Sequence, residues 1–194
     1  MNKQLLGLGA IVLALGLSTN KVQAGILLEP YMGYGQGTTK LTPSGGNEIS
    51  SKSTGVTLGA RVAYTLPALF WFGVDYSMLT GGKSKTDGAT TEDDITRSNL
   101  YAVAGVDFPI LVRGWVGYGL MNDTTVKQTG GDAKLTGGTA IKAGVGFNMI
   151  PLMSVNLEMI KYSGPKATFG GADQALDKYD ETGYNLSISV PFDL

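Results

Sequence analysis

Apolar and polar side chains alternate along eight segments of the chain. Between Ile26 and Tyr34 every second residue is apolar, and Glu29 and Tyr31 fall in the intervening set. A period of two is the signature of a β-strand, because successive side chains of a strand point to opposite faces. The predicted strands are residues 26–35, 55–66, 70–78, 97–108, 112–120, 141–149, 154–159 and 183–192.

Prolines punctuate this pattern at regular intervals. Pro67, Pro109 and Pro151 follow one another at 42 residues, and Pro191 comes 40 residues later. Proline cannot donate to a strand ladder, so the first three mark tight turns. Polar stretches, each with a glycine pair, lie between these corners and predict flexible loops of about 15 residues; they are residues 38–53, 80–94, 122–135 and 164–178. Short turns and long loops therefore alternate along four hairpins.

Two barrels fit eight amphipathic strands, one soluble and one in a membrane. The apolar set holds roughly 40 side chains, and the interior of an eight-stranded barrel is only just wide enough for side chains to fill. The other set is rich in glycine and carries few long charged residues, so it fits inside. We therefore predict an all-β fold, an eight-stranded antiparallel up-and-down transmembrane β-barrel, with its apolar face toward lipid.

Aromatic residues of the apolar set occur where the two interfacial belts of a membrane barrel belong. One group lies near the proline turns and the other near the polar stretches. The predicted girdle residues are Tyr34, Tyr64, Phe70, Phe72, Tyr76, Phe108, Tyr118, Phe147, Tyr184 and Phe192.

The first residues have the composition of a secretory signal. A lysine precedes an apolar run over residues 5–17, and small residues stand at Val22 and Ala24. The run is too short to span a bilayer, which favours a cleaved signal over a retained anchor helix. The predicted organisation is a signal peptide over residues 1–24 and one barrel domain over residues 25–194.

Charged residues of the inward set come in both signs. Glu29, counted from the start of the first strand, and Arg61, counted from the end of the second, reach similar heights on neighbouring strands, and Asp107 and Arg113 flank the Pro109 turn. A buried charge costs several kcal/mol unless it is paired, so we expect these groups to neutralise one another. The expected interior set is Glu29, Arg61, Asp75, Asp107, Arg113, Lys142 and Glu158, with Arg97 above them. These charges could form an ion path or a proton relay. The narrow interior of an eight-stranded barrel instead favours a polar plug that maintains the shape of the barrel.

Small residues form a shallow stripe on the outward set, at Ala102, Ala104, Gly114 and Ala143. Small side chains let neighbouring membrane segments approach closely. The stripe is a candidate contact for lipid or for a second protomer. The alternative is that it reflects ordinary variation among the residues of a lipid-facing wall. A ring of such barrels could enclose lipid.

The phrases "TAIKAGVGFNMIPLMSVNLEMIKYSG" and "YNLSISVPFDL" complete a pattern that resembles the small OmpA/OmpW-type outer-membrane β-barrels of bacteria. The resemblance implies periplasmic short turns, external long loops, and partners among outer-membrane lipid, lipopolysaccharide and the assembly machinery. That machinery reads a last strand that usually ends in Phe, whereas this chain ends in Leu194. No OmpA-type peptidoglycan-binding domain is expected after the barrel.

Composition narrows the function classes further. The formal net charge is −1, which argues against a nucleic-acid partner. The chain has no histidine, the base on which outer-membrane acyltransferases and deacylases of similar size rely, so we expect no enzyme. Residues 91–94 ("TEDD") lack the spacing of a calcium loop, and neither a metal nor a cofactor is expected. The expected function is an envelope structural or surface- and lipid-interaction role. The alternative is transport, through a channel for small hydrophobic molecules or an oligomeric porin-like assembly.

Overall fold

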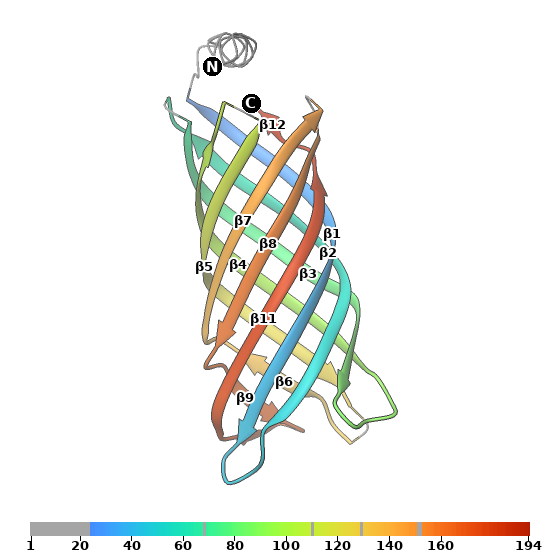
Figure 1. Cartoon of the computed structure of the whole chain (residues 1–194). Coiled ribbons are helices and arrows are strands. Elements are labelled where there is room, and N and C mark those ends of the chain that lie inside the picture. Colours follow the sequence, from blue (N-terminus) through green and yellow to red (C-terminus); the bar gives the residue numbers. More distant parts are fainter. Residues whose placement is uncertain (1–23, 68, 110, 129, 151–152) are drawn as a thin grey trace, which may run out of the picture.

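The computed structural model describes residues 24–67, 69–109, 111–128, 130–150 and 153–194, and these residues form one antiparallel sheet (Figure 1). Eight long strands build its wall: β1 (Gly25–Pro43), β2 (Ile49–Thr65), β3 (Phe70–Thr86), β4 (Asp93–Asp107), β5 (Val112–Lys127), β7 (Thr139–Ile150), β8 (Met153–Ser163) and β11 (Leu176–Ser189). Four short strands are added to them: β6 (Ala133–Thr136), β9 (Lys166–Phe169), β10 (Ala172–Gln174) and β12 (Phe192–Asp193). The described residues include no helix long and apolar enough to cross a membrane.

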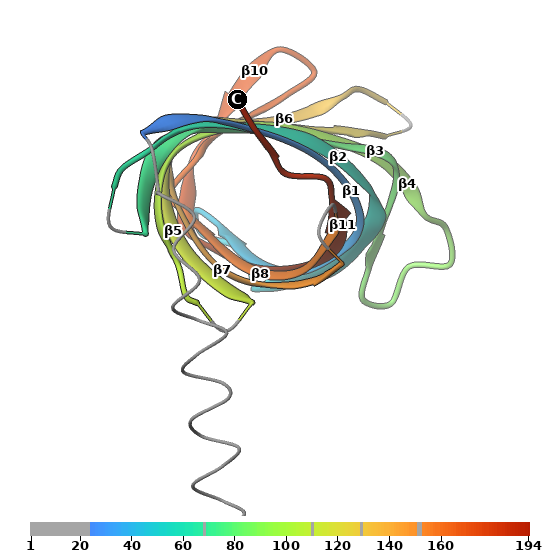
Figure 2. The same cartoon turned by 90° about the horizontal axis from the view of Figure 1, so that it is seen from above.

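The sheet closes on itself, as the view along its axis shows (Figure 2). Each long strand pairs with its neighbour in the chain, β5 pairs with β7 across the β6 excursion, and β1 pairs with β11. Closure gives the backbone N–H and C=O groups of every wall strand a hydrogen-bond partner. This is required in the bilayer because hydrocarbon cannot form hydrogen bonds with them. The predicted eight-stranded antiparallel barrel is confirmed.

Burial follows the predicted alternation. On β1, Met32 and Tyr34 are 60% and 57% exposed on the outer wall, whereas the intervening Glu29 is fully buried. Apolar side chains therefore cover the outside of the band, and the interior holds the buried charges and most of the glycines of the wall strands. The predicted signal peptide lies outside the described residues, apart from Ala24.

The turns at Pro67 and Pro109 share one geometry. The amide of Leu66 donates to the carbonyl of Phe70 at 2.8 Å, and that of Phe108 donates to Val112 at 2.7 Å. Each connection ends in a leucine with positive φ, 70° at Leu69 and 64° at Leu111. A residue in this left-handed region is expected where a three-residue hairpin loop closes. Pro151 lies outside the described residues.

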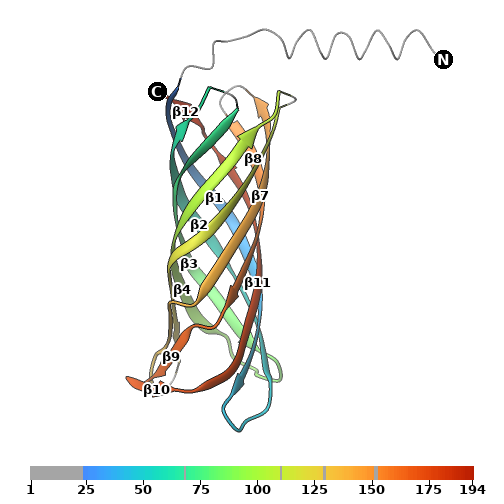
Figure 3. The same ribbon diagram turned by 90° about the vertical axis from the view of Figure 1, so that its left-hand side faces the viewer.

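The structure corrects the predicted long loops, since most of these residues are in strands. β1 and β2 continue until only residues 44–48 connect them, and β3 and β4 leave residues 87–92. β6, β9 and β10 form an added flap beside the end of the barrel (Figures 1 and 3). Beyond the lipid both faces of a strand are wet, so the alternation that signals a strand disappears while backbone pairing continues. Exposed pairs such as Lys83–Asp94, at 2.6 Å, cross the extended hairpins.

We call the end of the barrel that carries the proline turns and the C-terminus the turn end. The opposite end, which carries the extended hairpins, is the loop end. They lie at the top and bottom of Figure 1, respectively.

Three large inward rings each lie over a glycine directly opposite on the next strand. The pairs are Tyr31 with Gly59, Trp71 with Gly105, and Trp115 with Gly144. A Cβ built on any of these glycines would come closer to the ring than the 3.0 Å that real Cβ atoms respect. The inward glycines thus make room for bulky side chains.

Gly144→Ala should therefore destabilise the barrel by about 1–3 kcal/mol, because the new methyl group overpacks against Trp115. The measurement is the urea midpoint in lipid vesicles, followed by the heat-sensitive gel mobility of the folded form. Gly114→Ala is the matched control, since its Cβ would meet nothing nearer than 3.9 Å. Equal midpoints for the two variants would contradict the packing argument.

Candidate functional site

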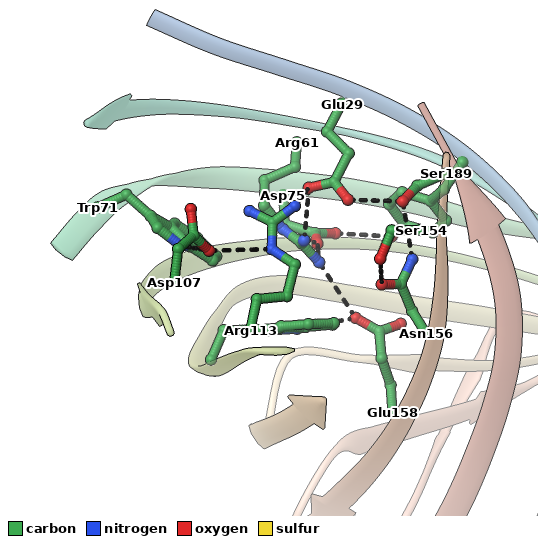
Figure 4. Close-up of polar contacts among 12 residues, drawn as sticks. Glu29, Arg61, Trp71, Asp75, Asp107, Arg113, Ser154, Asn156, Glu158 and Ser189 are labelled. Atoms are coloured by element: carbon green, nitrogen blue, oxygen red, sulfur yellow. Dashed lines mark hydrogen bonds and ion pairs between the residues drawn. The ribbon is translucent and has the colours of Figure 1, made fainter. Parts of the chain in front are cut away.

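A cluster of charged side chains fills the middle of the barrel (Figure 4). We call it the central cluster, and it consists of Glu29, Arg61, Asp75, Arg113, Lys142 and Glu158. Its members come from β1, β2, β3, β5, β7 and β8, because the inward parity of each strand brings one of them to this level. All six are almost completely buried.

Arg61 is the hub of the central cluster. Its guanidinium lies 2.8 Å from Glu29, 3.0 Å from Asp75 and 3.3 Å from Glu158. Glu29 and Asp75 flank it on the neighbouring strands, whereas Glu158 reaches it from across the barrel. The guanidinium carbon also lies 4.4 Å from the centroid of the Trp115 ring, a cation–π distance.

The other two cations tie the same carboxylates together. Lys142 Nζ lies 3.0 Å from Asp75 and 3.5 Å from Glu158. Arg113 Nη1 lies 3.0 Å from Glu29, so each of the three carboxylates contacts two cations. Such sharing offsets much of the desolvation cost that an isolated buried charge would carry.

Neutral donors saturate the remaining oxygens. Tyr31 Oη donates to Asp75 at 2.8 Å, Trp115 Nε1 donates to Glu158 at 3.0 Å, and Ser189 Oγ donates to Glu29 at 2.6 Å. Hydrogen-bonded and paired, the carboxylates hold their positions in a barrel interior that excludes most solvent. The cluster and its donors fill the cross-section at this level.

The structure places the predicted interior residues at three levels, with the central cluster in the middle, Asp107 at the turn end and Arg97 toward the loop end. Glu29 and Arg61 are direct cross-strand partners, and so are Asp107 and Arg113. Asp107 lies at the turn end with its side chain 43% exposed, where it accepts a hydrogen bond from Trp71 Nε1 at 3.1 Å. The plug role of these residues stays a prediction, now with a defined geometry.

Arg97 is set apart from the central cluster, toward the loop end. It pairs at 2.6 Å with Glu181, which also accepts a 2.6 Å hydrogen bond from Tyr179. The sequence analysis missed Glu181 because it began the last strand at residue 183. The inward parity of Asn185 and Gly183, continued by two residues, would have found it.

Between the central cluster and the Arg97–Glu181 pair lies a cavity of about 50 Å³. Polar groups such as Asn99 and Asn185 line it, and Tyr101 and Tyr162 share a 3.0 Å hydrogen bond nearby. Its volume suits a few water molecules, far fewer than a hydrated channel requires.

A larger cavity of about 430 Å³ lies on the loop-end side of the Arg97–Glu181 pair, and we call it the vestibule. Its wall combines side chains of the extended hairpins with side chains of the added flap. The apolar members include Leu41, Ile49, Ile95, Val126, Leu135, Phe169 and Leu176. The vestibule is thus a half-apolar hollow with a charged floor, and no motif in the sequence indicated it.

All ten predicted girdle aromatics are exposed on the outer wall. Tyr64 and Phe72 contact each other near the turn end, with ring centroids 5.9 Å apart. Tyr34 and Tyr76 lie in mid-strand rather than beside loops, since β1 and β3 run on past them to Pro43 and Thr86. They lie near the loop-end limit of the apolar band.

The four small residues also face outward, on β4, β5 and β7, with Gly114 half-buried. Their role as a lipid or protomer contact stays a prediction. No group of three or more potential metal ligands occurs among the described residues.

Comparisons with known proteins agree with this architecture. The family model described as outer membrane protein beta-barrel domain matches residues 9–192. No curated protein sequence matches the chain.

Three solved structures share the fold. Ail of Yersinia pestis, solved with the heparin analogue sucrose octasulfate, is 16% identical with a TM-score of 0.55 over 87% of this chain and 99% of its own. OprG of Pseudomonas aeruginosa is 14% identical with a TM-score of 0.54, covering 89% and 98%. Neisserial surface protein A is 17% identical with a TM-score of 0.50, covering 84% and 97%.

At these identities the solved structures show the fold alone, whereas the family model spans nearly the whole sequence. The closed wall of the structure, apolar outside and charged inside, is consistent with this match. The chain therefore belongs to the outer membrane protein beta-barrel domain family and is an integral protein of the outer membrane.

Proposed function

We propose that this protein is a non-enzymatic, non-conducting barrel that serves the envelope by holding its loop-end hairpins and flap at the cell surface. The observation that carries this proposal is the central cluster, whose buried ion pairs occupy the cross-section. Ions would have to break several of these pairs to pass. An envelope structural role and a surface- or lipid-interaction role both require a rigid wall of this kind.

The chemistry of the interior supports a non-enzymatic role. The carboxylates of the central cluster are each engaged by two cations, which leaves them poorly suited to act as a general base or nucleophile. The sequence also has no histidine to activate a serine or a water molecule.

The vestibule favours a second candidate, the binding and passage of small hydrophobic molecules. Its volume of about 430 Å³ lies in the range of small-molecule sites, and its wall is rich in aliphatic side chains. The floor at Arg97 and Glu181 closes the axial path, so an apolar molecule would have to leave toward the membrane. An oligomeric porin-like assembly that encloses lipid is a further transport proposal, and it would rest on the outward stripe of small residues.

Purified protein in planar bilayers should give no steady ohmic current. Arg61→Ala should lower the free energy of unfolding by about 3–5 kcal/mol, because it leaves three buried carboxylates to share two cations, yet it should still not conduct. The measurements are single-channel recording and the urea midpoint in vesicles.

Lys83→Ala is the matched control for that variant, because it removes one cation from an exposed pair and should leave the midpoint nearly unchanged. A reproducible ohmic current from the wild type or from Arg61→Ala would overturn the plug interpretation and favour a channel.

If the vestibule admits apolar molecules, cells that make the protein should take up N-phenyl-1-naphthylamine faster than cells with an empty vector. Leu135→Gln should slow this uptake, because it places an amide in the apolar wall. Lys166→Gln, next to the wall but outside it, is the control and should not change the rate. Fluorescence of the probe in intact cells reports the rate, and equal rates with and without the protein would exclude this candidate.

A further inference from the structure

A second hollow lies on the outer wall of the barrel, away from the interior and the vestibule. It measures about 480 Å³ and is built on β1, β2 and β11. Its lining residues are Gln36, Gly37, Thr38, Lys52, Ser53, Thr54, Thr182 and Tyr184. Most of these side chains belong to the outward set, so the hollow faces what surrounds the barrel.

Strand register brings hydroxyl groups and lysines into one row across this hollow. Thr38 of β1 is the direct partner of Thr182 on one side and of Lys52 on the other. Lys161 of β8 is opposite Thr182, and Lys85 of β3 is opposite Lys52. The row thus runs Lys161, Thr182, Thr38, Lys52, Lys85 over five adjacent strands, and all three lysines are exposed outward.

Three other lysines at this end of the barrel are already paired with carboxylates. Lys40, Lys83 and Lys178 pair with Glu48, Asp94 and Asp180, respectively. The hydrogen bond that Lys83 Nζ donates to Asp94 raises the pKa of Lys83, as expected for a satisfied cation. Within the part of the chain that the structure describes, Lys52, Lys85 and Lys161 have no carboxylate within ion-pair distance.

The Lys52–Lys85 pair is unfavourable by itself. Like charges directly opposite each other on a sheet face repel and destabilise the pairing. The nearest outward carboxylate along β11, that of Asp180, is already 3.3 Å from Lys178. An anion held between the lysines would remove this repulsion.

The height of the row indicates where such an anion comes from. On β2 the outward residues on the turn side of Lys52 and Thr54 are Val56 and Leu58, and on β8 Met159 lies two residues before Lys161. Lys161 therefore lies just beyond the apolar band, at headgroup level, and Lys52 lies slightly farther out. Lys85 lies farther still, seven residues beyond Met78 of β3, because a row of direct partners runs obliquely across tilted strands. Tyr184 borders the hollow on the membrane side, a position that interfacial tyrosines favour.

We propose that this hollow binds a phosphate group of lipid A, the phosphorylated anchor of lipopolysaccharide in the outer leaflet. Lys52, Lys85 and Lys161 supply the positive charge, and the hydroxyls of Thr38, Thr54 and Thr182 donate hydrogen bonds to the phosphate oxygens. Neighbouring strands are about 4.8 Å apart, so Lys161 and Lys52 stand about 14 Å apart and can reach over the hollow from both sides. The proposal goes beyond the envelope role and uses no residue of the barrel interior.

The test is titration of the purified protein in nanodiscs with diphosphoryl lipid A, read by native mass spectrometry. The triple variant Lys52→Gln, Lys85→Gln, Lys161→Gln should bind about 100-fold more weakly, from the contribution of a lysine near an anionic lipid surface. The triple variant Lys40→Gln, Lys83→Gln, Lys178→Gln is the matched control, since it loses the same charge from lysines that are already paired. It should bind like the wild type.

Two further probes separate the possible sources of the phosphate. Enzymatically dephosphorylated lipid A should bind as weakly as the first triple variant does, and phosphatidylglycerol should not compete at equal concentration. Equal losses in both triple variants would show general electrostatics and overturn the site. Equal competition by phosphatidylglycerol would overturn the assignment to lipid A. Gel mobility verifies that every variant is folded, which exposed Lys→Gln changes should allow.

Discussion

The mutual neutralisation of charges inside a closed wall is the constraint on which this structure depends. Arg61 contacts Glu29, Asp75 and Glu158, and Lys142 and Arg113 contact the same carboxylates a second time. Removing any one ion would leave one unbalanced charge buried in the cluster, which costs more than a single ion pair contributes. The cluster therefore binds six strands of the barrel to one another across its interior, in addition to the hydrogen bonds of the wall.

The same constraint separates the functions of the two surfaces. With its cross-section filled by ion pairs and by rings stacked over glycines, the interior is suited to rigidity. The recognition that we propose involves the loop-end hairpins, the vestibule and the part of the outer wall at headgroup level. These regions lie beyond the apolar band, where water or headgroups can satisfy polar groups and the sequence is free of the alternation that lipid imposes.

Individual residues show how far the sequence could be read. The register of Glu29 with Arg61 could be predicted because both are counted from nearby strand ends, and a pleated strand rises by a constant amount per residue. The extended hairpins could not, because strand prediction relied on one face being apolar, and Glu181 was missed since the predicted last strand began two residues after it. The vestibule was equally hidden, since Leu41 of β1 and Leu135 of β6 meet only through the added flap.

The eight wall strands, the apolar face of each, and the turns at Pro67 and Pro109 could be read from the chain alone. They follow from two local rules, the period of two along a strand and the missing amide of proline. The folded barrel was needed to show how the cations share the carboxylates, where the hairpins end, and that one row is formed by Lys161, Thr182, Thr38, Lys52 and Lys85. These relations join distant parts of the chain, and they exist only once barrel closure has set the stagger of all eight strands.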